Sequence, residues 1–237
     1  MAVTLRGARA ILLPGTGSDD DYLRRAFGPA LTQAGVVFTA HRPCPDRLVA
    51  GYLDALDEVA AAGAPIVVGG VSLGAAVAAA WAIAHPGRAL AVLAALPPWL
   101  GASDAAPAAA AARATAATLR RDGLDATVAE LRATSPAWLA DELTRSWTRQ
   151  WPGLPEAMEA AADYTAPTAA QLGTLATPMG VAGSPDDPVH PVSVARQWAA
   201  AAPHAALRTV TLTDFGADPS ALGATALAAL AAVESTD

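Results

Sequence analysis

One short stretch of the sequence restricts the fold more than any other, because it joins an extended segment to a helix through a tight turn. Pro65–Val68 is apolar and mostly β-branched, which is typical of a buried strand. Leu73–Ala84 is rich in alanine and predicts a helix. The intervening residues 70–74 read G-V-S-L-G, a G-x-S-x-G pattern. In this strand–turn–helix context, the pattern indicates a strained turn that presents the hydroxyl of Ser72 at the edge of a sheet.

The residues beside Ser72 also suit a reactive serine. A turn of this kind needs small neighbours, because the strand and the helix must approach each other closely, and Gly70, Gly74 and Ala76 meet that need. A helix that begins at Leu73 leaves backbone N–H groups free near the hydroxyl, where they stabilise negative charge. We therefore predict that Ser72 is a nucleophile rather than part of a purely structural turn.

The segments around this turn alternate between short apolar strands and amphipathic helices. Such an alternation predicts an α/β fold whose mostly parallel sheet is covered by helices on both faces. The other expected strands are Ala8–Leu13, Val36–Ala40, Ala89–Leu96, Met179–Ala182 and Leu207–Leu212, and the other expected helices are Asp20–Ala34, Asp46–Ala62, Val192–Ala202 and Ala221–Val233. Ligands bind outside the carboxyl ends of parallel strands, so the loops at that edge are the candidates for function.

Residues 98–175 interrupt the alternation, since they contain several helical stretches broken by prolines and no convincing strand. We expect a core built from residues 1–97 and 176–237, with residues 98–175 forming a helical cap insertion over the strand ends. Trp99, Trp138, Trp147 and Trp151 belong to this insertion. Their rings either line an apolar pocket or pack between helices and core.

Two further loops at expected strand ends carry candidate groups. Leu13–Ser18 is rich in glycine, and the backbone N–H of Thr16 within it is a candidate donor to an oxyanion, together with the N–H of Leu73. The same loop fits a dinucleotide poorly, because Asp20 stands where a third glycine belongs. The second loop, residues 182–191, reads A-G-S-P-D-D-P-V-H-P and follows a late strand.

Together with the Ser72 turn, these loops and the helical insertion resemble the α/β-hydrolase family over nearly the whole chain, with fewer strands at the N-terminal end. The resemblance implies a catalytic acid after the late strand, in a segment similar to G-x-x-D-x-x-x-P. Asp187 fits this segment by its distance to Pro191, and Asp186 fits it by its distance to Gly183. We favour Asp187; alternatively, the two aspartates only cap the helix that begins near Pro191.

The sequence departs from the family in the position of the base, which the family places on a histidine after the last strand. The corresponding residues 211–219 contain no histidine. We predict that His190 is the base, oriented by Asp187, and we keep His41 as an alternative because it follows a strand at the same edge. His85 and His204 are expected at the opposite edge of the sheet.

These residues predict a serine-dependent hydrolase that cleaves a small, mainly apolar ester, thioester or related acyl substrate through an acyl-enzyme. The missing late histidine supports an alternative, a non-hydrolytic protein of the same fold that binds a ligand or works without a triad. A net charge of −7 and the absence of any basic run argue against nucleic acid as a partner.

Cys44 is the single cysteine, so the sequence offers neither an internal disulfide nor a Cys/His metal site, and we expect no metal and no cofactor. We interpret Cys44 as an incidental thiol, because no activating pattern surrounds it. No apolar run reaches the ~20 residues that span a bilayer, and the first residues lack a secretory signal. We therefore expect a cytoplasmic protein with no membrane partner.

Overall fold

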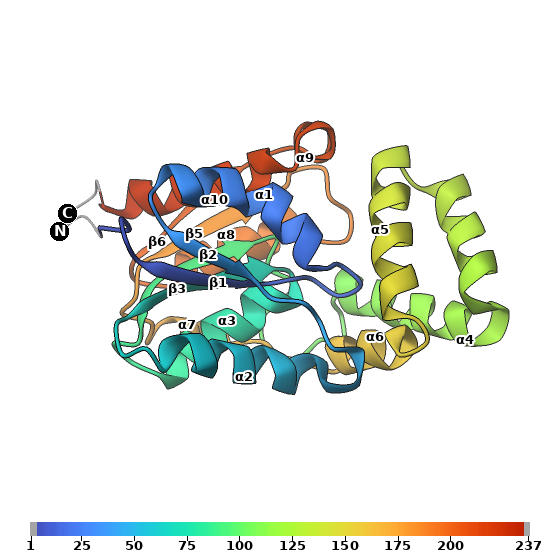
Figure 1. Ribbon diagram of the computed structural model, residues 1–237, viewed down its shortest axis with the longest axis horizontal. Coiled ribbons are helices and arrows are strands. Elements are labelled where there is room, and N and C mark those ends of the chain that lie inside the picture. The colour runs from blue at the N-terminus through green and yellow to red at the C-terminus, as the bar shows by residue number, and fades with distance from the viewer. Residues whose placement is uncertain (1–3, 235–237) are drawn as a thin grey trace.

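A six-stranded parallel sheet organises the computed structural model, which describes residues 4–234 (Figure 1). The strand order is β2-β1-β3-β4-β5-β6, so the strand before Ser72 lies inside the sheet. The strands are β1 (Arg9–Leu13), β2 (Val37–Ala40), β3 (Ile66–Val71), β4 (Ala89–Ala95), β5 (Met179–Gly183) and β6 (Ala205–Thr209). Their carboxyl ends all point to the same edge, on the right in Figure 1.

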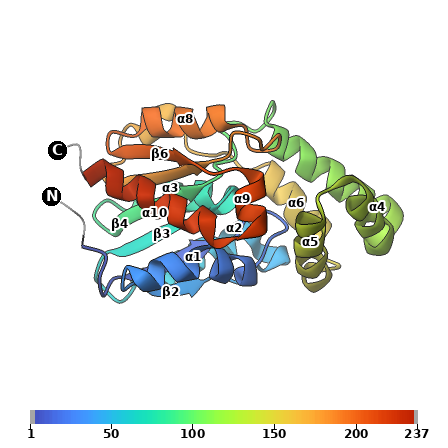
Figure 2. The ribbon, with the colours of Figure 1, turned by 90° about the horizontal axis from the view of Figure 1, so that it is seen from above.

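Helices cover both faces of the sheet, which confirms the predicted fold class. Helices α1 and α10 pack together on one face (Figure 2), and α2, α3 and α8 lie on the other. The helices are α1 (Asp20–Gln33), α2 (Leu48–Ala60), α3 (Leu73–Ala84), α4 (Pro107–Thr134), α5 (Ala137–Gln150), α6 (Leu154–Ala162), α7 (Ala169–Leu172), α8 (Val192–Ala201), α9 (Leu212–Ala217) and α10 (Ser220–Glu234), with a 3₁₀ turn at Pro45–Arg47.

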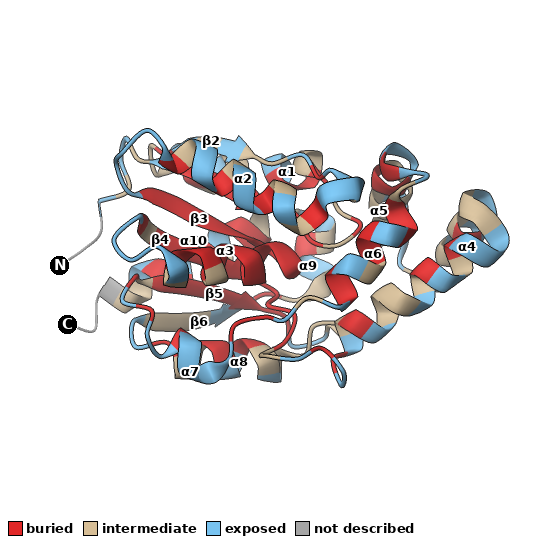
Figure 3. Ribbon diagram, turned by 90° about the horizontal axis from the view of Figure 1, so that it is seen from below, coloured by how far each residue is buried: buried red, intermediate tan, exposed pale blue. Residues whose placement is uncertain are grey.

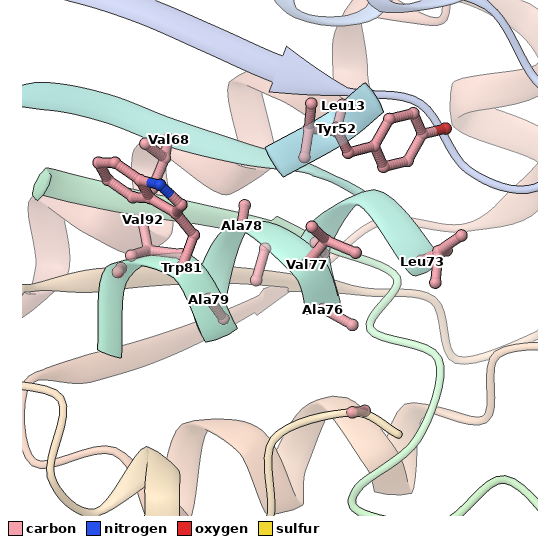
Figure 4. Close-up of a cluster of buried hydrophobic side chains, with 14 of the residues drawn as sticks. Leu13, Tyr52, Val68, Leu73, Ala76, Val77, Ala78, Ala79, Trp81 and Val92 are labelled. Atoms are coloured by element: carbon pink, nitrogen blue, oxygen red, sulfur yellow. The ribbon is translucent and has the colours of Figure 1, made fainter. Parts of the chain in front are cut away.

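The core of the molecule consists of a separate apolar cluster on each face of the sheet. Helix α3 is buried along most of its length, and its ribbon in Figure 3 is mainly red, because it packs between the sheet and α2. Its alanines allow close approach, while Trp81 at its far end fills the space beside Val68 and Val92 (Figure 4). This packing fixes the first turn of α3, which carries the residues after Ser72.

Helices α4, α5 and α6, called the cap helices below, lie beyond the carboxyl ends of the strands (Figure 1). Gly123 has non-helical backbone angles (φ 79°, ψ 175°) and divides α4 into two arms. The cap helices have an apolar cluster of their own, formed by Ala116, Leu119, Trp147, Leu154 and Met158. The short α7 packs on α8 and α3 instead, and the division of the chain into core and insertion stays a prediction.

The expected last strand, Leu207–Leu212, was wrong in its bounds. Strand β6 ends at Thr209, and Leu212 begins α9, a helix that the apolar alternation did not predict. The hydroxyl of Thr211 accepts a hydrogen bond from the backbone N–H of Asp214 and caps this helix. A local cap therefore outweighed the strand-like pattern. Within residues 4–234, no helix combines the length and apolar character needed to cross a membrane.

Candidate active site

Ser72 occupies the sharp turn between β3 and α3. Its backbone lies in the left-handed region (φ 51°, ψ −119°), which is costly for a residue other than glycine. The Ser72 N–H donates to the carbonyl of Ala95 at 2.9 Å, and the Ser72 carbonyl accepts from the N–H of Ala76 at 3.1 Å. A Cβ atom at Gly70 or Gly74 would lie 2.2 or 2.1 Å from the Leu13 carbonyl oxygen. Close packing against β1 thus holds the strained serine in place.

The loop after β1 and the first turn of α3 lie beside Ser72 and carry the two predicted oxyanion donors. A Cβ atom at Gly15 would lie 3.4 Å from the Cβ of Ser72, so the loop after β1 passes directly beside it. The loop closes with a hydrogen bond of 3.0 Å from the Ser18 N–H to the Gly15 carbonyl. Within the described part of the chain, no group accepts a hydrogen bond from the N–H of Thr16 or Leu73. Both predicted oxyanion donors are therefore available.

The structure brings Ser72, His190 and Asp187 together in a line. His190 Nε2 lies 2.9 Å from the Oγ of Ser72, and His190 Nδ1 lies 2.9 Å from Oδ2 of Asp187. Both distances are within hydrogen-bonding range for a nucleophile, a base and an orienting acid. Ser72 is 8% exposed, so the hydroxyl is nearly enclosed in this structure.

The loop between β5 and α8 sets the geometry of both Asp187 and His190. Oδ1 of Asp187 accepts hydrogen bonds from the backbone N–H groups of Val189 and His190, at 2.8 and 3.0 Å. The backbone of Ser184 also forms an isolated parallel bridge with Pro191, which brings the two ends of the loop together. Asp187 therefore fixes the backbone of His190 with one oxygen and its ring with the other.

The family of the chain follows from a comparison with known proteins. The model of the "Alpha/beta hydrolase family" matches residues 4–231, which is nearly the entire sequence. The chain belongs to the alpha/beta hydrolase family. No curated protein sequence matches it.

Solved structures similar to this alpha/beta hydrolase show the same fold at low sequence identity. The carboxylesterase structure from Nitrososphaera gargenis has a TM-score of 0.73 and 16% identity, covering 98% of this chain and 93% of that one. MenH from S. aureus has a TM-score of 0.70 and 15% identity, covering 97% and 95%. The putative non-heme bromoperoxidase BpoC from Mycobacterium tuberculosis has a TM-score of 0.68 and 20% identity, covering 96% and 93%.

In this alpha/beta hydrolase, the two adjacent aspartates face different partners. Oδ1 of Asp186 accepts hydrogen bonds from the Ser184 hydroxyl at 2.7 Å and from the backbone N–H of Leu212 at 2.9 Å. These two bonds lower the pKa of the Asp186 carboxyl. Asp186 thus ties the loop to the start of α9, while Asp187 meets the histidine. Sequence reasoning missed this tie, because no local spacing links residues so far apart. Neither carboxylate caps α8.

The charge state of Asp187 decides which tautomer of His190 fits. Burial raises the pKa of the Asp187 carboxyl, but hydrogen bonds from the ring and backbone of His190 and from the Val189 N–H outweigh burial and leave the pKa below its ordinary value. An ionised carboxylate only accepts hydrogen bonds, so Nδ1 of His190 carries the proton. In the neutral ring, Nε2 is then the acceptor for the hydroxyl of Ser72, which is the arrangement that a general base needs.

The other three histidines lie outside this group. His41 contacts the ring of Tyr52 edge-on at 5.4 Å, and its buried Nε2 has no hydrogen-bond partner in the described structure. Burial lowers the pKa of His41. His85 stacks on Trp81 at the end of α3, and the exposed His204 precedes β6, so both lie at the far edge of the sheet.

The four tryptophans of residues 98–175 have different surroundings. Trp147 belongs to the apolar cluster of the cap helices, and Trp138 meets Phe215 edge-on at 5.6 Å. Trp99 is buried in the core, with its indole N–H donating to the carbonyl of Tyr164 at 3.2 Å, whereas Trp151 is partly exposed. For Trp99, Trp138 and Trp147 these contacts favour packing over the lining of a pocket.

One cluster of described residues has the spacing of a metal site, namely Asp19, Asp21 and Glu142. Each of these carboxylates already pairs with an arginine. Arg145 bonds to Asp19 at 2.7 Å and also to Glu142, and Arg25 bonds to Asp21 at 3.0 Å. The arginines supply the positive charge that a cation would bring, so we interpret the cluster as an ion-pair network.

Proposed function

We propose that this chain is a serine hydrolase that cleaves a small, mainly apolar ester, thioester or related acyl substrate through an acyl-enzyme. The observation that carries the proposal is the continuous line from the Oγ of Ser72 to Nε2 of His190 and from Nδ1 to Asp187, with 2.9 Å at each step. The apolar residues Val71, directly before Ser72, and Leu96, just beyond the end of β4, lie at the same edge of the sheet as Ser72 and favour an apolar acyl group.

In the first half-reaction, the Oγ of Ser72 attacks the acyl carbon while His190 Nε2 takes the hydroxyl proton. The electron pair of the carbonyl moves to its oxygen, and the N–H groups of Thr16 and Leu73 hold the resulting oxyanion. When the tetrahedral intermediate collapses, the leaving oxygen or sulfur departs with the proton from His190. The acyl group is then esterified to Ser72.

In the second half-reaction, His190 takes a proton from a water molecule as that water attacks the acyl-enzyme. A second oxyanion forms in the same place and collapses with release of the carboxylic acid. The proton on His190 returns to the Oγ of Ser72. Throughout the cycle, Asp187 stays ionised, orients the ring and stabilises the imidazolium.

The test uses Ser72→Ala and a short substrate, p-nitrophenyl butyrate. We expect turnover to fall by at least about a thousandfold, because binding and oxyanion stabilisation alone remain. Ser103→Ala is the matched control, since Ser103 is a buried serine whose hydroxyl accepts a hydrogen bond from Arg113. Undiminished turnover in Ser72→Ala would refute the assignment of the nucleophile.

A fluorophosphonate probe separates this proposal from the non-hydrolytic alternative. A serine activated by a base reacts rapidly, and mass spectrometry is expected to place the label on Ser72. Absence of both labelling and Ser72-dependent turnover would support a ligand-binding protein of the same fold. We favour the hydrolase, because the alternative was motivated by a missing base and His190 lies within hydrogen-bonding distance of Ser72.

A further inference from the structure

The cap helix α5 contacts the loop that carries the Thr16 N–H, on the side of that loop away from β1. Gln150 at the end of α5 donates from Nε2 to the carbonyl of Ser18 at 3.0 Å, and the same nitrogen lies 2.9 Å from the hydroxyl of Ser146. Gln150 is only 6% exposed. A buried amide with these two partners constrains the backbone two residues after Thr16.

An ion pair lies at the end of the same loop. Oδ2 of Asp19 accepts a hydrogen bond from Arg145 of α5 at 2.7 Å, and Oδ1 accepts one from the other terminal nitrogen at 3.1 Å. Oδ1 also accepts from the backbone N–H groups of Asp21 and Tyr22, so Asp19 is the N-cap of α1. Asp19 is 2% exposed. This one carboxylate therefore joins the loop, α1 and the cap.

Trp147 forms a steric support for the loop. A Cβ atom at Gly17 would lie 2.7 Å from the indole nitrogen of Trp147 and 3.2 Å from Cε of Met158. Gly17 has a φ of +72°, which glycine adopts readily. The indole N–H is buried without a hydrogen-bond partner in the described structure, so the ring contributes contact surface here rather than a hydrogen bond.

Thr16 lies between two fixed neighbours. On one side, an added Cβ at Gly15 would touch Ser72, and on the other, an added Cβ at Gly17 would clash with Trp147. The hydroxyl of Tyr52 also donates to the carbonyl of Pro14 at 3.0 Å, which fixes the start of the loop to the core. Figure 1 shows that the loop after β1 extends toward α5. The loop is thus held by the core at its start and by the cap at its end.

We propose that helix α5 positions the Thr16 N–H toward the oxyanion, and that Arg145, Trp147 and Gln150 are positioning residues for the reaction. The inference rests on the proposed function. An oxyanion donor acts within about 2.7–3.1 Å of the developing charge, and a misplacement of ~1 Å reduces the rate by up to ~10². In this proposal, the packing of α5 against the loop after β1 governs how well the oxyanion is stabilised.

The experiment compares Arg145→Met and Gln150→Met with Arg132→Met. Arg132→Met is the matched control, because it removes the same charge and an ion pair to Asp141 of α5 without touching the loop. The measurements are kcat and KM for p-nitrophenyl butyrate per serine titrated with a fluorophosphonate, and the Ki of an aliphatic trifluoromethyl ketone. This ketone forms a hemiketal whose oxyanion occupies the same position as that of the intermediate.

We expect Arg145→Met and Gln150→Met to lower kcat per titrated serine by about tenfold, to leave KM within about twofold, and to raise the ketone Ki about as much as kcat falls. A purely structural role would reduce only the number of active serines. If both variants match Arg132→Met in kcat and Ki, the inference is wrong. If Arg145→Met does not fold, Gln150→Met alone decides.

Failure of the proposed function gives a different result. If Ser72→Ala turns over the ester at the wild-type rate, or the wild-type chain neither labels nor hydrolyses, then both the function and the inference fail. If Ser72→Ala is inactive while the α5 variants behave like the control, only the role of α5 is refuted.

Discussion

Replacing Gly74 with alanine tests the close approach between α3 and β1 that supports the serine turn. Gly74 lies in the first turn of α3, where alanine would ordinarily favour the helix by about 1 kcal/mol. An added Cβ would instead lie 2.1 Å from the Leu13 carbonyl oxygen and 2.7 Å from the Pro14 carbonyl oxygen. The shorter contact falls 1.3 Å short of the 3.4 Å at which ordinary contact begins.

The obstructing atoms belong to the backbone, so no side-chain rotation relieves the clash. Overpacking of a core costs about 1–3 kcal/mol, and two backbone contacts place Gly74→Ala at about 3 kcal/mol. After the helix-propensity gain, about 2 kcal/mol remains, which corresponds to a Tm lower by about 4–8 °C for a domain of this size. The same displacement moves Ser72 and Leu73 away from Thr16, so kcat is expected to fall as well.

Gly51→Ala is the matched control, since Gly51 lies within α2 and a Cβ there would meet nothing within 4 Å. We expect it to raise the Tm by about 2–4 °C and to leave kcat unchanged. Calorimetry or thermal denaturation followed by circular dichroism measures both variants. If Gly74→Ala raised the Tm as Gly51→Ala does, the described packing of α3 against β1 would be wrong.

Three further predictions concern the acid and the base. Asp187→Asn is expected to lower kcat by about 10³–10⁴, because the amide oxygen would keep the two backbone N–H bonds and the amide NH2 would then donate to Nδ1 and favour the wrong tautomer of His190. Asp186→Asn is expected to cost less than about tenfold, and ester hydrolysis measures both. The lowered pKa of Asp187 stabilises the fold fully above about pH 4, the unfolded value, and this stabilisation is lost as the pH falls through the folded-state pKa. The Tm difference between wild type and Asp187→Asn is therefore expected to shrink from about pH 6 to about pH 3, and a constant difference would contradict the linkage. His41→Phe is expected to keep wild-type kcat and not to lower the Tm, because the buried Nε2 has no partner in the described structure; a large loss of activity would return His41 to consideration as the base.

The elements of the fold were predictable wherever local pattern and tertiary packing agree. Helix α3 matches its predicted bounds, since alanine content and the turn at Ser72 point to the same start. Strand β3 runs three residues past the predicted Val68, through Gly69 and Gly70. Glycine lowers strand propensity, but a Cβ at Gly69 would lie 2.3 Å from the Leu93 carbonyl oxygen. Only the neighbouring strand explains glycine there, and a single segment does not reveal its neighbours.

The candidate site was predictable in its residue types but not in its geometry. The spacing of Asp187 and His190 made their pairing conceivable. The orientation of the His190 ring toward Ser72, however, depends on the hydrogen bonds that Asp187 accepts from the backbone of the loop. Distance along the chain could not decide which of Asp186 and Asp187 pairs with His190, because that depends on the directions in which their side chains point. The contacts of Gln150 and Arg145 with the loop after β1 join residues more than a hundred positions apart, which no local spacing encodes.

In the proposed mechanism, Asp187 and His190 both come from the loop between β5 and α8, so the segment after β6 supplies no group for proton transfer. That segment forms α9, where Phe215 packs edge-on against Trp138 and the backbone N–H of Leu212 donates a hydrogen bond to Asp186. Side-chain substitutions in α9 are therefore expected to change the packing of Trp138 on the core rather than the proposed proton transfers. Conversely, deletion of residues 184–191 would remove the proposed acid and the proposed base together, so both proposed roles depend on this one loop.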